Sequence, residues 1–103
     1  MFDMKKAMEM KKKMDEIQSR LETITVDGES GDGKYKVTAT VTATKKVKNI
    51  SISDELMQSG DKEHLEDLIL IAIERAMEQA QNVAEAETRS IAMTGGLGGM
   101  FGM

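Results

Sequence analysis

The stretch from residue 34 to residue 53, KYKVTATVTATKKVKNISIS, constrains the fold of this chain more than any other. Apolar residues occupy its odd positions from Tyr35 to Ala43, and lysine or threonine occupies the even positions from Lys34 to Thr44. Successive side chains of a strand point to opposite faces, so this alternation predicts a strand with one buried face and one wet face. Threonine and valine suit such a half-buried pleated surface. The sequence therefore predicts a sheet at the centre of the chain.

The alternation changes phase before this stretch ends. Ile50 and Ile52 sit at even positions, whereas the earlier apolar residues sit at odd positions. A slip of one residue would place the second set on the wrong face, so a turn or bulge must lie near residues 44–48. We expect two antiparallel strands joined there.

A glycine-rich segment precedes these two strands. Ile24 and Val26 begin a first short strand, which is followed by the sequence DGESGDG from Asp27 to Gly33. Glycine permits positive φ and aspartate hydrogen-bonds to the nearby backbone, so this composition predicts a tight turn. A calcium-binding EF-hand loop is not indicated, because its fifth position would be Gly31 and its sixth Asp32.

Helical periodicity flanks the predicted sheet on both sides. From Phe2 to about Glu22, apolar residues recur three and four positions apart, as in a helix with one packing face. After a break, a second long helix is expected, with Ser59 or Asp61 as its N-cap. The expected architecture is an α+β fold with a long N-terminal helix, a three-stranded antiparallel sheet and a long C-terminal helix. Residues 1–93 would form one domain, and the half-glycine segment 94–103 a flexible Gly/Met-rich tail.

The composition limits the chemistry that the chain can perform. It has 103 residues, no cysteine and one histidine, so disulfides, thiolate catalysis and cysteine zinc sites are excluded. His64 lies among acidic residues near the start of the second helix, but too few ligands converge there for a metal site. No nucleophile–base pair can be assembled. We expect no enzymatic activity, no metal, no cofactor and no small-molecule substrate.

The beginning of the chain, MFDMKKAMEMKKKM, contains no long apolar run. This pattern predicts neither a signal peptide nor a membrane span, and with the absence of cysteine it favours a cytoplasmic location. Acids interleave with the lysines, so the segment is not typical of a membrane-surface helix either. We expect no membrane partner.

The net charge of −4 is unevenly distributed along the chain. Residues 34–53 contain five lysines and no acid, whereas residues 54–103 contain three bases and ten acids. Such an asymmetry permits one basic surface on an acidic protein, or a sheet whose lysines pair with the acidic helix that follows. The lysines of the first helix mostly have an acid four residues away, which favours a salt-bridged, solvated face. Glu16 and Arg20 have the same spacing.

The second helix is apolar nearly all round between Leu68 and Ile73. One small sheet cannot cover such a helix on every side, and burying each large aliphatic side chain is worth ~2 kcal/mol. A second subunit is the natural cover, so we expect a homodimer. The candidate interface residues are Leu68, Ile69, Leu70, Ile71, Ile73 and Met77.

Several segments together indicate a known family. They are the Met/Lys-rich first helix, the segment GESGDG, the strand KVT from Lys36, VKNISISDELM from Val47 and DKEHLEDLILIAIERAMEQA from Asp61 to Ala80. In these the chain resembles the YbaB/EbfC family of bacterial nucleoid-associated proteins. The resemblance departs at the hairpin, where VTATKK replaces the usual Gly- or Asn-containing turn, and at Asp54, where the family usually has proline.

The resemblance implies a small homodimer with helical arms that extend like tweezers. It also implies binding to double-stranded DNA with low sequence preference, in the nucleoid, to organise it or to modulate gene expression. Charge alone favours the strand lysines as the DNA contacts, whereas the resemblance favours the helical arms. The candidate DNA-binding residues are Lys5, Lys6, Lys11, Lys12, Lys13, Lys34, Lys36, Lys45, Lys46 and Lys48. The alternative function is a non-catalytic dimeric protein–protein interaction module that uses the Met-rich first helix and the tail.

Overall fold

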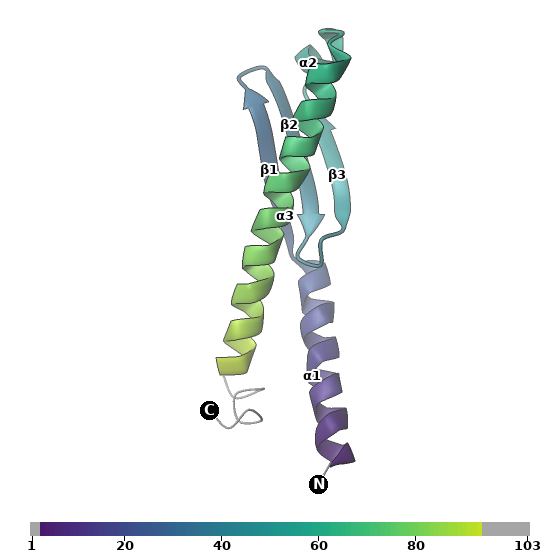
Figure 1. The fold of residues 1–103 in the computed structure, drawn as a ribbon, viewed down its shortest axis with the longest axis vertical. Helices are drawn as coiled ribbons and strands as arrows, with labels where there is room; N and C mark the ends of the chain where they lie inside the picture. Colours follow the sequence, from purple (N-terminus) through teal and green to yellow (C-terminus); the bar gives the residue numbers. More distant parts are fainter. Residues whose placement is uncertain (1–2, 94–103) are drawn as a thin grey trace.

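The computed structural model describes residues 3–93, with helices at both ends of the chain and a sheet between them (Figure 1). This arrangement confirms the expected α+β fold. The expected tail at residues 94–103 and the first two residues lie outside the described part. The elements are α1 (Met4–Thr23), β1 (Thr25–Asp32), β2 (Tyr35–Thr42), β3 (Val47–Ile52), α2 (Asp54–Gln58) and α3 (Lys62–Met93).

The three strands form one antiparallel sheet in the order β1-β2-β3. Between β2 and β3 the register shifts, because Thr40 lies opposite Asn49 whereas Val41 lies opposite Val47. Lys48 is therefore an extra residue on β3, and residues 43–46 make the turn. The turn and the bulge confirm the phase change that the sequence predicts, and they bring Ile50 and Ile52 to the same face as the apolar residues of β2.

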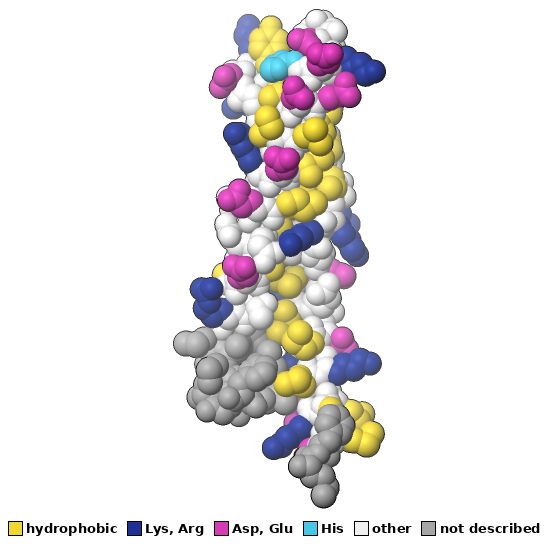
Figure 2. Space-filling view, viewed as in Figure 1, with side chains coloured by type: hydrophobic (Ala, Val, Ile, Leu, Met, Phe, Trp, Pro, Cys, Tyr) yellow, Lys and Arg dark blue, Asp and Glu magenta, His cyan; other side chains and the backbone are white. Residues whose placement is uncertain are grey.

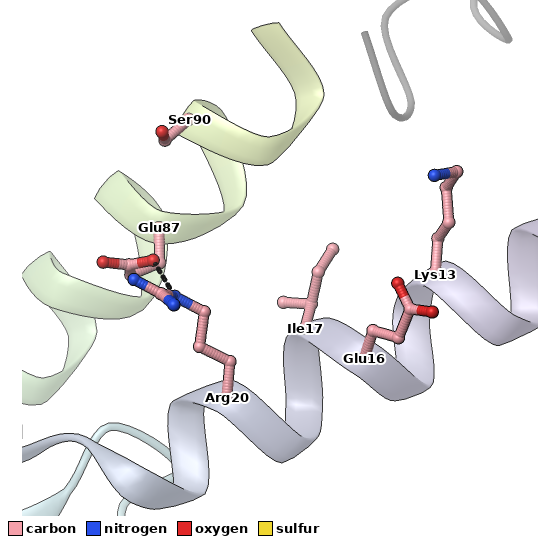
Figure 3. Close-up of a pocket in the computed structure, with 6 residues that line it drawn as sticks. All are labelled: Lys13, Glu16, Ile17, Arg20, Glu87 and Ser90. Atoms are coloured by element: carbon pink, nitrogen blue, oxygen red, sulfur yellow. Dashed lines mark hydrogen bonds and ion pairs between the residues drawn. The ribbon is translucent and has the colours of Figure 1, made fainter. Parts of the chain in front are cut away.

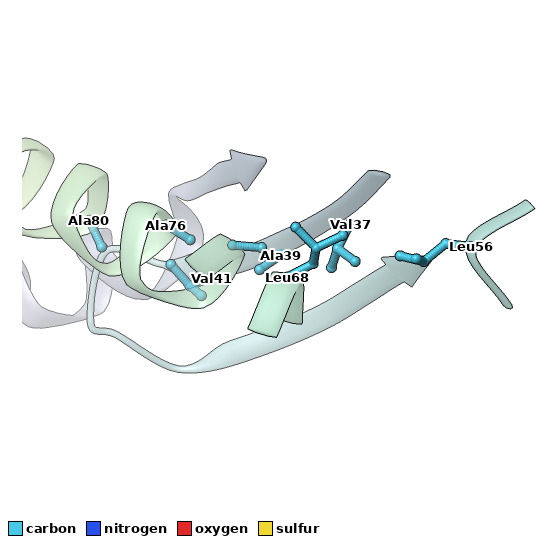
Figure 4. Close-up of a cluster of buried hydrophobic side chains, with 8 residues drawn as sticks. Val37, Ala39, Val41, Leu56, Leu68, Ala76 and Ala80 are labelled. Atoms are coloured by element: carbon cyan, nitrogen blue, oxygen red, sulfur yellow. The ribbon is translucent and has the colours of Figure 1, made fainter. Parts of the chain in front are cut away.

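The main core lies between this face of the sheet and α3 (Figure 4). Val37, Ala39 and Val41 of β2 are fully buried, as the alternation predicts. Opposite them α3 presents three buried alanines spaced four residues apart, so its backbone can lie close to the sheet. They are Ala72, Ala76 and Ala80.

The prediction of a turn from Asp27 to Gly33 was wrong. β1 continues to Asp32 and pairs residue for residue with β2, so only residues 33–34 form the turn. Gly28 lies directly beneath α3, where a Cβ atom would overlap the backbone of Ala72 and Ala76. The glycine at this position thus serves close packing of helix on strand rather than chain reversal.

The burial alternation of β2 fails at its two ends. Tyr35 is 46% exposed, although it shares the apolar phase, because it lies at the end of the sheet beyond the core cluster. Thr42 was expected on the wet face but is buried, and its hydroxyl accepts a hydrogen bond from the Lys46 N–H at 3.1 Å. The turn folds over Thr42 and satisfies its polar group, which periodicity alone does not reveal.

The helix starts follow local capping signals. The Asp3 carboxylate accepts a hydrogen bond from the Lys5 N–H at 3.0 Å, and the Asp61 carboxylate accepts one from the His64 N–H at 3.1 Å. Asp61 is therefore the N-cap of α3, in agreement with one of the two expected residues. The short helix α2 was not predicted; it inserts Leu56, which is 1% exposed, into the core.

Candidate nucleic-acid interface

The basic side chains of the turn between β2 and β3 lie at the C-terminal end of α1. The Lys46 Nζ atom is 3.6 Å from the Glu22 Oε1 atom, and the Ala43 N–H donates to the Ile24 carbonyl at 2.9 Å. Ala43 is buried together with Ile17 and Leu21 of α1 in a second small core. The packing therefore places the turn from residue 43 to residue 46, which includes Lys45 and Lys46, next to the last turn of α1, and Lys48 follows two residues further on in β3.

Lys34 and Lys36 occupy the opposite end of the sheet. Lys34 belongs to the turn between β1 and β2, whereas the turn between β2 and β3 is at the other end of the central strand. The eight residues of β2 separate the two turns by ~25 Å at the usual rise of a strand. The structure thus divides the strand lysines that the sequence treats as one group.

The lysines of α1 do not form the ion pairs that their spacing predicts. Lys5, Lys6, Lys11 and Lys12 are exposed and Lys13 is half-buried. Within residues 3–93 the ion pairs are Arg20–Glu87 and Lys46–Glu22, so none involves these five lysines. Exposed i,i+4 pairs are weak because ordering two long side chains offsets the attraction. The α1 lysines are consequently available to an external anion.

Arg20 makes the one ion pair between the described parts of α1 and α3. Its Nε atom lies 2.7 Å from the Glu87 Oε2 atom, and the hydrogen bond to this carboxylate raises the pKa of Arg20 above its ordinary value. The expected partner four residues away, Glu16, is not used. Sequence spacing could not reveal Glu87, because this partner is 67 residues from Arg20 along the chain.

A groove of about 400 Å³ lies between the two helices beside this ion pair. Figure 3 shows that Lys13, Ile17 and Arg20 extend from α1 toward the side on which α3 lies. Glu87 and Ser90 of α3 line the other wall. The groove is therefore lined mainly by charged groups, including Glu16, with Ile17 as its apolar side chain.

The candidate interface residues of α3 fall into three environments. Leu68 is 7% exposed and belongs to the core of its own chain, while Ile69, Ile73 and Met77 pack partly buried against that core. Leu70 is 60% exposed and Ile71 is 37% exposed. The sheet of the same chain thus leaves part of the α3 surface uncovered, as the sequence predicts.

No group of three or more histidine, aspartate or glutamate residues between residues 3 and 93 is arranged to hold a metal ion. None of the described helices is long and apolar enough to cross a membrane.

A family model for the YbaB/EbfC DNA-binding family matches residues 1–97. The chain belongs to this family. A nucleoid-associated protein of Flavobacterium johnsoniae is 40% identical over 89 residues, which cover 86% of this chain and 80% of the relative. A nucleoid-associated protein of Ruminiclostridium cellulolyticum is 40% identical over 100 residues, which cover 97% of this chain and 84% of the relative.

The fold of this YbaB/EbfC chain also matches a solved structure. An uncharacterized protein from Helicobacter pylori superposes with a TM-score of 0.64 at 19% identity, covering 84% of this chain and 86% of that one. In the turn between β2 and β3, Lys45 adopts a φ of 69°. This is left-handed backbone at a residue that has a Cβ atom.

Proposed function

We propose that this YbaB/EbfC chain is a homodimeric nucleoid-associated protein that binds double-stranded DNA with low sequence preference. The observation that carries the proposal is the placement of cations on a protein with a net charge of −4. The lysines along α1 have no ion-pair partner among the described residues, and Lys45, Lys46 and Lys48 lie near the C-terminal end of this helix. A basic surface on an acidic protein concentrates its attraction for polyanions in one region. The family description and the names of the relatives support DNA as that polyanion.

Low sequence preference follows from the chemistry of the exposed side chains. Lysine ammonium groups bind phosphate as point charges, and phosphate contacts position a protein on a duplex without reading its bases. Tyr35 is the one residue of the phenylalanine, tyrosine and tryptophan types between residues 3 and 93, so stacking on unpaired bases is not favoured. We therefore infer that the sugar–phosphate backbone of the duplex is the main ligand. We also infer that the protein acts in the cytoplasm, at the nucleoid.

The homodimer is inferred from the width of the sheet. Three strands span ~14 Å, whereas one helix covers ~10 Å. α3 lies closer to β1 than to β3, as its contact with β1 indicates. Arg75 of α3 donates a hydrogen bond to the Glu29 carbonyl of β1 at 2.7 Å. Ile50 and Ile52 of β3 are accordingly only half-buried. A band of hydrophobic side chains follows this gap between α3 and β3 and continues onto α1 (Figure 2).

A second copy of α3 fits this gap. Ile73 and Met77 lie on the flank of α3 that borders β3, and helical spacing adds Leu70 to that flank. Ile71 is four residues before Arg75 and so lies on the opposite flank, next to β1. We infer that Leu70, Ile73 and Met77 contact the same residues of a second copy, as a two-fold interface requires.

The salt dependence of binding to unrelated duplexes tests the DNA proposal. Each phosphate that a lysine neutralises contributes about 0.9 to the slope of log affinity against log salt. Replacing Lys5, Lys6 and Lys12 by alanine removes six cations from a dimer, and so does replacing Lys45, Lys46 and Lys48. We expect both triple variants to reduce the slope by several units, because one group lies along α1 and the other lies at the C-terminal end of the same helix.

A third triple variant supplies the matched control. Replacing Lys34, Lys36 and Lys62 removes the same charge from the far end of the molecule, where all three side chains are exposed. Its slope should stay near that of the unmodified protein. An equal reduction in all three variants would indicate a nonspecific charge effect, and no reduction in the first two would contradict phosphate binding by these lysines.

An interaction module remains the second candidate, because α1 exposes methionine side chains. Met4 is 71% exposed, Met8 70% and Met14 53%, and unbranched methionine adapts to varied apolar partners. Binding of a protein partner through these residues would change little with salt, whereas binding to DNA would weaken steeply. Replacing the three methionines by glutamine should leave duplex affinity unchanged if DNA is the ligand.

A further inference from the structure

Arg20 continues a line of cations along α1. Lys6, Lys13 and Arg20 are spaced seven residues apart, so they lie on nearly the same side of the helix, about 10 Å from one to the next. Lys13 and Arg20 both line the groove beside α3. Within the described part of the chain Lys13 has no ion pair, whereas Arg20 is held by Glu87. Among these three cations, Arg20 is thus the one that forms an ion pair with a described residue of the chain.

The position of the Arg20–Glu87 pair leaves it accessible from outside. The Arg20 side chain is 60% exposed and the Glu87 side chain 26%, so a phosphate group can approach the guanidinium but must compete with the carboxylate. Glu87 occupies the same kind of site that a phosphate oxygen would take, because guanidinium binds both oxyanions through its N–H groups. Since both residues belong to one folded chain, the carboxylate has a high effective concentration at Arg20.

We propose that Arg20 is a reserve contact for a DNA phosphate and that Glu87 masks it. The inference rests on the proposed DNA-binding function and deepens it. In the resting protein the Glu87 carboxylate keeps the Arg20 guanidinium from the duplex, so the duplex contacts the lysines of α1 and those near the turn between β2 and β3, but not Arg20. Removal of the carboxylate charge frees one arginine per protomer for the sugar–phosphate backbone.

The test is a double-mutant cycle read out by duplex binding between 50 and 200 mM salt. Glu87→Gln should bind more tightly than the unmodified protein and add about 0.9 to the salt slope for each arginine released. Its gain in affinity should therefore be about 3.5-fold larger at 50 mM than at 200 mM salt for each new contact. Arg20→Gln should leave the slope unchanged, and the double variant should show none of the gain.

Glu78→Gln is the matched control. This substitution removes the same charge from an exposed position of the same helix, but the Glu78 side chain has no hydrogen bond or ion pair with another described residue. Circular dichroism melts of all four variants check that α1 stays folded. The masking of Arg20 would be overturned by any of three results. The salt slope could rise equally in Glu78→Gln, its rise could persist in the double variant, or the slope could fall in Arg20→Gln. If the unmodified protein binds no duplex at any salt concentration, the DNA-binding function itself fails instead.

Discussion

Gly28 shows how one residue sets the distance between α3 and the sheet. A Cβ at this position would overlap the backbone of Ala72 and Ala76, which cannot move aside as a flexible side chain could. We expect Gly28→Ala to lower the free energy of unfolding by about 2 kcal/mol or more, as overpacking of a core does. Urea denaturation at a fixed protein concentration measures this loss.

Gly33→Ala is the control for the backbone effect of glycine. Gly33 has a φ of 54°, but a Cβ there would meet open space. Its replacement should cost about 1 kcal/mol, because alanine disfavours positive φ. If the two substitutions cost the same, the close approach of α3 to β1 would not be what requires Gly28.

The turn between β2 and β3 carries local strain. Lys45 adopts a φ of 69° and its N–H donates to the Thr42 carbonyl at 2.8 Å, so the turn holds a lysine where glycine or asparagine fits better. We expect Lys45→Gly to raise the free energy of unfolding by about 0.5–1 kcal/mol. Lys45→Ala removes the same charge but keeps the Cβ, so urea denaturation should show no gain for it. Equal stabilities of the two variants would show that the turn is not strained.

At the scale of the whole molecule, the half-covered sheet predicts which substitution separates two copies. Leu70→Asp places a charge on the flank of α3 beside β3, where we propose the second copy, and an unpaired buried charge costs several kcal/mol. Sedimentation should therefore show a folded monomer. Ile71→Asp introduces the same charge on the flank beside β1 and should leave the dimer intact. If Ile71→Asp separates the two copies and Leu70→Asp does not, the interface lies on the β1 side of α3. If the unmodified protein is itself a monomer, the proposed interface does not exist.

Local periodicity was sufficient to predict most of the elements. The apolar spacing of α1 and α3, the alternation of β2 and the phase change before Ile50 each depend on neighbouring residues, whose directions a helix or strand dictates. The N-cap Asp61 is local in the same way. The glycine-rich β1 was misjudged, because turn-forming composition does not show that a partner strand and a helix hold the segment extended.

The types of the candidate site residues were predictable, but their grouping was not. The sequence alone shows which residues are lysines, and a lysine is rarely buried, so their exposure could be predicted. Only packing separates Lys34 and Lys36 from the other strand lysines, brings Lys46 to Glu22 and places Glu87 against Arg20. These relations join residues far apart in the chain. They depend on how helices and strands pack in space, because the periodicity of one element fixes directions within that element and not the distance to another.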